Sequence, residues 1–161
     1  MKSLWAPWRM EYIGSEKPSG CLLCAAAGKG MSDGFYVLFT GKVSTVMLNR
    51  YPYNCGHLMV SPIRHVASLE DLTEEESGDL FTLLRASTAA LKKTLNPEGF
   101  NVGMNIGRAS GAGIEEHLHM HVVPRWNGDT NYMPVISSTK VMPEHLEETY
   151  NKLKPLFEGL R

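Results

Sequence analysis

Apolar and polar residues alternate along several short segments of the chain, and this period of two predicts strands. The clearest alternation covers Phe100–Ile106, where every second residue is apolar. A second strand is predicted over residues 117–123, where apolar residues alternate with three histidines. Because alternate side chains point to opposite faces, all three imidazoles should share one face of this strand. The other predicted strands are Phe35–Thr40, Lys42–Asn49 and His57–Ser61, which makes five in all.

A period near 3.6 residues predicts two helices. The longer helix runs from about Thr73 to Leu95, because Thr73 and Glu76 have the spacing of a capping box and Asn96-Pro97 ends the pattern. Its apolar stripe is formed by Leu80, Leu84, Leu91 and Leu95, with Phe81 beside it. Pro143 opens a C-terminal helix that Pro155 kinks or ends, with Leu146, Tyr150 and Leu153 facing inward. Strands that arrive in runs favour an α+β domain with a mainly antiparallel sheet.

The 161 residues divide into three parts and are enough for one domain with a substantial core. Residues 1–20 are interpreted as an N-terminal arm, because they hold two tryptophans and little periodicity. Residues 21–126 carry the predicted sheet and the long helix. Residues 127–161 are interpreted as a C-terminal extension whose helix packs on the same domain.

Composition narrows the classes of partner. The net charge of −1 and the 20% of charged residues give no reason to expect a nucleic acid or a membrane surface. There is no apolar run of about 20 residues and no apolar core of a signal peptide. The missing signal-peptide core leads us to expect a cytoplasmic location. Three cysteines are too few for a disulfide scaffold, so reduced thiols or metal ligands are expected.

Three histidines on one face can serve either a metal or nucleophilic and acid–base chemistry. A glycine-rich loop, residues 107–113, directly precedes them, and glycines let backbone N–H groups approach a phosphate closely. Asn105 can donate from its amide, and Arg108 supplies a full charge. A histidine beside a phosphate held there could attack phosphorus, and a second could protonate a phosphate oxygen. The alternative is a tight hairpin whose histidines face solvent.

Cys21 and Cys24 form a Cys-x-x-Cys pair with three interpretations: two small buried side chains, a redox pair, or half of a zinc site. A zinc site needs two more ligands, and His65 is a candidate for one of them. Sites with two cysteines and two histidines are structural and not catalytic. His57 is interpreted as a strand residue with a hydrogen bond. Trp126 comes five residues after His121 and so is placed at the border of the histidine site.

The segment from His117 to Val123 has the pattern His-φ-His-φ-His-φ-φ, and here the chain resembles the histidine-triad (HIT) superfamily. Asn105 with the glycine loop, and the segment from Asn49 to Pro62, match that superfamily as well. The resemblance covers about residues 20–126, so the second part of the chain is identified as a HIT domain. The segments Leu4–Arg9 and Pro124–Asp129 resemble the bacterial diadenosine tetraphosphate (Ap4A) phosphorylase-like branch.

The resemblance implies a HIT-like α+β fold, a homodimer or higher homo-oligomer, and an enzyme that hydrolyses or transfers nucleoside phosphates through a nucleotidylated histidine. It makes His119 the nucleophile, His121 the contact to the α-phosphate that helps move the proton, and His117 the residue whose backbone carbonyl orients His119. Asn105 matches a phosphate-contacting amide, and Asn49 matches a position that is acidic in many members and contacts the ribose hydroxyls. The rest of the expected substrate-binding set is Arg108, Ser110, Gly111, Gly113 and Trp126.

The resemblance also implies a structural zinc ion held by Cys21, Cys24, His65 and His117, and no organic cofactor. Two departures concern the phosphate site: Ile114 stands where many members have serine or threonine, and Glu115 and Glu116 add negative charge. The substrate is left open among Ap4A, other dinucleoside polyphosphates, a nucleoside phosphoramidate and ADP, and the acceptor between water and phosphate. The alternatives are a zinc-stabilised nucleotide-binding module with little turnover, and a metalloenzyme whose three histidines hold a catalytic metal.

Overall fold

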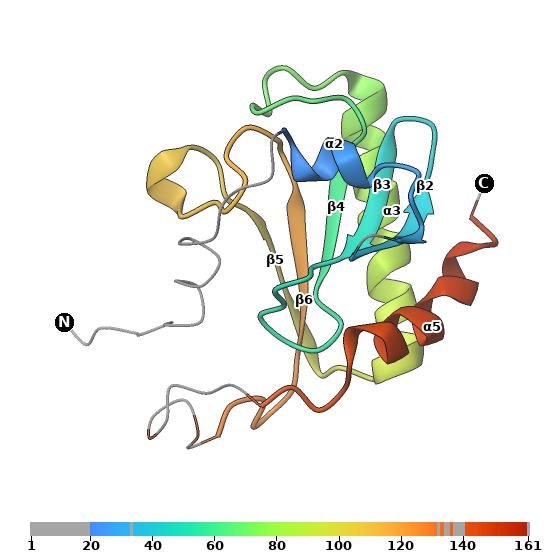
Figure 1. Ribbon diagram of the computed structural model, residues 1–161, viewed down its shortest axis with the longest axis vertical. Coiled ribbons are helices and arrows are strands. Elements are labelled where there is room, and N and C mark those ends of the chain that lie inside the picture. The colour runs from blue at the N-terminus through green and yellow to red at the C-terminus, as the bar shows by residue number, and fades with distance from the viewer. Residues whose placement is uncertain (1–19, 33, 132, 134–135, 137–140, 161) are drawn as a thin grey trace.

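The computed structural model describes residues 20–32, 34–131, 133, 136 and 141–160. The predicted N-terminal arm, residues 1–20, lies outside this range except for Gly20. Figure 1 shows one sheet with two long helices on one side and a short helix on the other. The elements are α2 (Leu22–Ala26), β1 (Met31–Ser32), β2 (Phe35–Thr40), β3 (Ser44–Leu48), β4 (Leu58–Pro62), α3 (Glu74–Leu95), β5 (Gly99–Met104), the 3-10 turn η1 (Arg108–Ser110), β6 (Met120–Arg125) and α5 (Leu146–Phe157).

The sheet has the strand order β1-β2-β3-β4-β6-β5, and every neighbouring pair is antiparallel. The predicted α+β class with an antiparallel sheet is confirmed, with six strands in place of five. The additional strand, β1, lies between the Cys-x-x-Cys pair and the first predicted strand. Two residues are too few to show an alternating pattern, so the sequence carried no signal for it.

The two faces of the sheet have different partners. On one face Leu38, Leu58 and Val122 pack against α3 and α5 in the larger core. On the other face Met47 and Met59 pack against Leu23 and Ala26 of α2 in a smaller apolar cluster. His121 pairs with Met59 across β4 and β6 and therefore lies on the α2 face, away from the long helices.

Helix α3 begins as the sequence predicts. The Thr73 hydroxyl accepts from the backbone N–H of Glu76, and the Glu76 carboxylate accepts from the N–H of Thr73. The helix ends at Asn96, whose backbone adopts the left-handed conformation with φ of 46°. The predicted stripe is wrong in one place: Phe81 is 62% exposed and Leu83 is buried instead, because Leu83 continues the stripe of Leu80 and Leu91.

Glu76 also binds Arg64, and replacing it tests how much this pair stabilises the fold. The Arg64 guanidinium and the N–H of Thr73 hold the pKa of the carboxyl at about 2, against an ordinary value of 4.5. Because the folded-state pKa is lowered, the pair contributes fully to the stability of the fold above about pH 5. This contribution is lost as the pH falls from about 5 toward the folded-state pKa of about 2. We expect Glu76→Gln to lower the free energy of unfolding by about 1–2 kcal/mol at pH 7, measured with urea.

The same measurement at pH 3 should show a smaller difference between wild type and Glu76→Gln. Glu75→Gln is the matched control, because Glu75 pairs with Lys42 and its side chain is 57% exposed. Such a surface pair contributes about 0–1 kcal/mol. An equal loss in the free energy of unfolding from the two variants would contradict the larger contribution expected from the pair of Glu76 and Arg64.

Helix α5 packs Tyr150, Leu153 and Phe157 against the sheet beside α3. The helix runs two residues past Pro155, so this proline does not end it. Phe157, two residues after the proline, is only 1% exposed, so the last apolar side chain of the helix is still buried in the core. Within the described residues, no helix has both the length and the apolar content needed to cross a bilayer.

Candidate active site

The three histidines divide between two clusters. Strand β6 begins at Met120, three residues later than predicted, because the N–H of Leu118 donates to Val66 in a loop and not to β4. His117 and His119 therefore precede the strand and are buried, whereas His121 lies within it and is half-buried. The rings of His119 and His121 lie 4.8 Å apart between centroids, and the ring of His117 points to the cysteine pair.

A backbone carbonyl fixes the protonation of His119. Its Nδ1 lies 2.8 Å from the carbonyl oxygen of His117, which can only accept, so Nδ1 carries the hydrogen. Nε2 then holds the lone pair that a nucleophile needs. Burial lowers the pKa of the His119 imidazole from its ordinary value, an effect that the bond to the carbonyl partly opposes. The ring is therefore neutral at pH 7.

A fourth histidine, His57, belongs to this cluster. It is fully buried, and its Nε2 lies 2.9 Å from Nδ1 of His121. The Tyr53 ring covers both imidazoles, with centroid distances of 4.6 Å to His57 and 5.7 Å to His121. From the sequence, His57 was interpreted only as a strand residue with a hydrogen bond. Its position in the Asn49–Pro62 segment that matches the HIT pattern was the one signal that could have drawn attention to it.

Asn49 contacts the histidine cluster, and Asn105 lies just beyond the end of β5. The side-chain oxygen of Asn49 accepts from the N–H of Tyr51, and its amide nitrogen lies 3.4 Å from Nδ1 of His57. Asn105 directly follows β5, whose last residue, Met104, pairs with Met120. Asn105 is thus at the level of His119 along the sheet.

The glycine-rich loop contains the short turn η1. Ser110 donates its hydroxyl to the carbonyl of Gly107, and Gly111 closes the turn with φ of 77°. Arg108 is 94% exposed and lies 3.6 Å from a carboxylate oxygen of Glu115. A surface pair of this kind contributes at most about 1 kcal/mol, so a phosphate could displace Glu115 from Arg108. Gly113 lies in the same loop, between η1 and the histidines.

Trp126 does not lie where the sequence suggested. Its indole N–H donates to the carbonyl of Asn96 at the end of α3. It follows Arg125, which pairs with Gly99 at the far end of β5. Five residues of strand span about 16 Å, so the distance along β6 separates Trp126 from His121.

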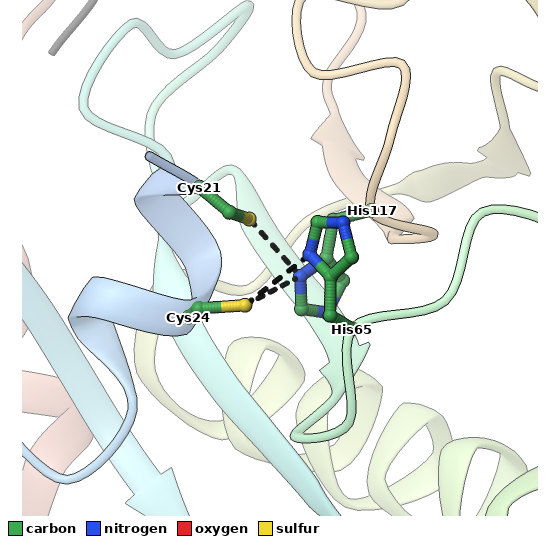
Figure 2. Close-up of side chains that lie close together, drawn as sticks. All are labelled: Cys21, Cys24, His65 and His117. Atoms are coloured by element: carbon green, nitrogen blue, oxygen red, sulfur yellow. Dashed lines mark hydrogen bonds between the residues drawn. The ribbon is translucent and has the colours of Figure 1, made fainter. Parts of the chain in front are cut away.

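The cysteine pair and two histidines form a second cluster on the α2 face (Figure 2). One ligand atom each from Cys21, Cys24, His65 and His117 lies within 4.8 Å of the others. The shortest distances are 3.1 Å from the Cys21 sulfur to Nδ1 of His117 and 3.3 Å from the Cys24 sulfur to Nδ1 of His65. His117 donates from Nε2 to the carbonyl of Pro62, 2.9 Å away, which leaves the Nδ1 lone pair facing the sulfurs.

The donor set of this cluster fits a tetrahedral metal ion. Zinc bound to two thiolates and two imidazoles places neighbouring sulfur and nitrogen atoms about 3.6 Å apart, close to the observed distances. Burial, followed by the neighbouring Cys21 thiol, raises the pKa of Cys24. Burial lowers the pKa of His117, so for both residues it favours the neutral form. Cys21, Cys24 and Cys55 are all free thiols, and Cys55 lies outside the cluster.

Comparison with known protein families identifies the family to which this arrangement of histidines belongs. The family model described as "HIT domain" matches residues 33–128, more than half of the chain. The chain belongs to the HIT domain family. The model covers the sheet from β2 to β6, helix α3 and both asparagine loops, and the predicted superfamily is thereby confirmed.

Named HIT relatives extend this comparison. A protein of Mycobacterium tuberculosis named AP-4-A phosphorylase is 40% identical over 158 residues, covering 92% of this chain and 80% of its own. A Dictyostelium discoideum protein named bis(5'-adenosyl)-triphosphatase is 30% identical over 128 residues, covering 76% of this chain and 85% of its own. The structure of a Zn-bound histidine triad family protein from Mycobacterium smegmatis superposes with a TM-score of 0.69 at 24% identity, covering 88% and 95%. That similarity shows the shared fold.

Proposed function

We propose that this HIT protein cleaves dinucleoside polyphosphates such as Ap4A through a nucleotidyl group carried on Nε2 of His119. The main support is the 2.8 Å contact between Nδ1 of His119 and the His117 carbonyl oxygen. This contact leaves the lone pair of a neutral imidazole on Nε2, on the side of the ring away from that carbonyl. The names of the Mycobacterium tuberculosis and Dictyostelium discoideum relatives support this class of substrate.

In the first step, Nε2 of His119 attacks the α-phosphorus of Ap4A, and an N–P bond forms as the P–O bond to the leaving ATP breaks. His121 donates a hydrogen bond to the phosphate oxygens, and ATP leaves as an anion with the electron pair of the broken P–O bond. In the second step, an acceptor oxygen attacks the same phosphorus and releases His119. Water as the acceptor yields AMP, and inorganic phosphate yields ADP.

The remaining substrate contacts are proposed from position. Asn49 would meet the ribose hydroxyls, and Asn105 would meet the α-phosphate beside His119. Backbone N–H groups of the loop that contains Gly111 and Gly113, with Arg108 and Ser110, would hold the outer phosphates. Trp126 is left out of this set, because its indole binds the end of α3.

Product analysis identifies the acceptor. We expect Ap4A incubated with the protein and phosphate to give ADP and ATP in equal amounts, measured by ion-exchange chromatography. Omitting phosphate should slow turnover at least about tenfold if phosphate is the natural acceptor, with AMP and ATP as the products. Equal rates with and without phosphate, with AMP in both, would make the enzyme a hydrolase. Binding of Ap4A with no products would favour the zinc-stabilised binding module.

A nucleoside phosphoramidate is the second substrate class, because the attack of His119 on an α-phosphorus is the same for a P–N leaving group. The third alternative, a catalytic metal held by three histidines, lacks support. His117 directs Nδ1 at the cysteines and His121 directs Nδ1 at His57, so their rings do not converge on one point with His119.

The ion proposed for the second cluster is a structural Zn²⁺ held by Cys21, Cys24, His65 and His117. When bound, it would supply a cross-link between α2, the loop after β4 and the segment before β6. Four protein ligands close the coordination sphere, which is the arrangement of a structural site and not of a catalytic one. The free thiols of the cluster suit a reducing compartment, and we propose the cytoplasm.

We also propose a homodimer or higher homo-oligomer. Strand β5 is at the edge of the sheet, and Val102 and the nearby Ile106 are each 45% exposed. An unpaired edge with apolar side chains is a template for pairing with a second copy. Light scattering should give twice the chain mass of 17.9 kDa, and Val102→Lys should shift the protein to the monomer.

A further inference from the structure

We propose that Asp129 is a positioning residue for the substrate site. Its carboxylate holds the side chain of Asn54, and Asn54 holds the site turn, residues 49–57, which joins β3 to β4 and carries Asn49 and Tyr53. The consequence for Ap4A rests on the proposed function. The conformation of the site turn is a property of the protein without substrate.

The argument begins at the side chain of Asn54, which is buried. Its amide nitrogen donates to the backbone carbonyl of Pro124 at 3.0 Å and to the carboxylate of Asp129 at 2.8 Å. Both partners can only accept, which settles the end of the amide that carries the nitrogen. These two bonds join the site turn to residues 70 and 75 positions further along the chain. A buried donor that lost its acceptor would have to find another, so the turn would shift at Asn54.

The carboxylate of Asp129 is itself held firmly, and its side chain is only 8% exposed. Oδ2 accepts from Nε of Arg125 at 2.5 Å and from the N–H of Trp126 at 3.3 Å, and Oδ1 accepts from Nη2 of Arg125 at 3.0 Å. Arg125 is the main reason why the pKa of this carboxyl is about 2, against an ordinary value of 3.8. The group is therefore an anion at neutral pH, with both oxygens fixed.

From Asn54 the site turn is bonded directly to the histidine cluster. The N–H of His57 donates to the carbonyl of Asn54 at 3.2 Å, and the N–H of Asn49 donates to the carbonyl of His57 at 2.9 Å. The neighbouring Tyr53 places its ring 4.6 Å from that of His57 and 5.7 Å from that of His121. A turn that shifted at Asn54 would displace both the amide proposed for the ribose and the ring that covers His121.

This contact shows how the segment after β6 can serve the site although Trp126 binds the end of α3. The chain turns sharply beyond the strand, where the N–H of Asp129 donates to the carbonyl of Trp126 at 3.1 Å and Gly128 has φ of 76°. The turn brings the carboxylate of Asp129 to Asn54. The residue of this segment that reaches the site turn is thus the acid and not the tryptophan.

The first experiment records the Cε1 proton resonances of the histidines by NMR without substrate. The Tyr53 ring lies over His57 and His121, so its ring current displaces their resonances. In Asp129→Ala we expect these two resonances to move by more than the line width and that of His65 to stay. Asp129→Asn keeps an oxygen at the position of Oδ2 and should retain the wild-type spectrum of both rings.

Turnover of Ap4A by the same proteins tests the consequence for the substrate. The proposed ribose contact of Asn49 is made in the ground state and the transition state alike, so its loss raises KM and leaves kcat little changed. We expect Asp129→Ala and Asn54→Ala each to raise KM about tenfold, with kcat within about threefold. The double variant should raise KM no further than either single variant, because both remove one bond. Asp129→Asn should stay within about twofold of the wild-type KM.

Glu76→Gln is the matched control for a loss of stability. Glu76 is also a buried carboxyl with a pKa of about 2, held by an arginine and a backbone N–H, and it lies at the start of α3. The variant should lower the free energy of unfolding and leave KM and the resonances of His57 and His121 as in wild type. A purely structural role of Asp129 would make Asp129→Ala behave like Glu76→Gln.

Unchanged resonances and an unchanged KM in a folded Asp129→Ala protein would overturn the inference. Equal defects in Asp129→Asn and Asp129→Ala would overturn the route through Asn54, because the asparagine keeps the acceptor and loses the charge. If Asp129→Ala fails to fold, Asn54→Ala removes the same hydrogen bond from the other side and decides the point by the same readings. Moved resonances in a protein whose wild type does not turn over Ap4A would support the positioning role and reject the proposed function.

Discussion

His119→Ala should lose essentially all turnover of Ap4A, a fall in kcat of at least about 10³-fold. No other side chain in the described cluster has both a neutral lone pair fixed by a carbonyl and a place beside His121. Without Nε2 of His119, the N–P bond of the proposed intermediate cannot form. Intact-mass spectrometry after brief mixing with Ap4A should show a gain of one AMP on wild type and none on His119→Ala.

His145→Ala is the control for this experiment, because it removes an imidazole from an exposed position at the start of α5. It should keep the adduct and the rate of wild type. His119 is 3% exposed, so alanine leaves a cavity, and His119→Gln provides a variant of similar volume without a nucleophilic ring. An AMP adduct on either His119 variant would falsify the assignment of the nucleophile.

Cys24→Ser should have the largest effect on stability. Serine is a poor zinc ligand, and a cross-link that joins distant segments contributes about 2–4 kcal/mol in proteins. For a chain of this size that corresponds to a loss of about 5–15 °C in Tm, measured by calorimetry on metal-loaded protein. Elemental analysis should give one zinc per chain for wild type and much less for the variant.

Cys55→Ser is the matched control, because Cys55 lies near Thr149 and outside the four-residue cluster. It should keep the zinc content and come within a few degrees of the wild-type Tm. A chelator that removes zinc should lower the Tm of wild type and of Cys55→Ser alike, and should leave Cys24→Ser nearly unchanged. A wild-type protein that binds no zinc, with a Tm indifferent to the chelator, would remove the basis of the metal proposal.

The sequence predicted those parts of the fold that depend on residues close together along the chain, namely the strands and the start of the long helix. The period of two predicted β5 and β6, short runs of strand-forming residues predicted β2 to β4, and the Thr73 and Glu76 spacing predicted the start of α3. The Cys-x-x-Cys pair, His65 and His117 were expected together because of the HIT resemblance, and the structure brings their ligand atoms within 4.8 Å. The zinc itself remains a proposal.

The features that were missed depend on contacts between distant residues. His57 and His121 are 64 positions apart, and only the pairing of β4 with β6 brings their rings together. Trp126 was placed at the site by its nearness in sequence, but a strand carries each further residue away from the histidines. Phe81 was placed beside the apolar stripe of α3, but it is 62% exposed, because the buried face of a helix is fixed by what packs on it.

The cysteine cluster has a consequence for how the protein is made. Cys21 and His117 are 96 residues apart, so a ribosome that adds about 5–20 residues per second needs about 5–20 s to deliver the second ligand after the first. Helix α2 has five residues and cannot persist alone during that interval. Both thiols of the nascent chain are then exposed, and the cluster assembles only where they stay reduced until His117 emerges.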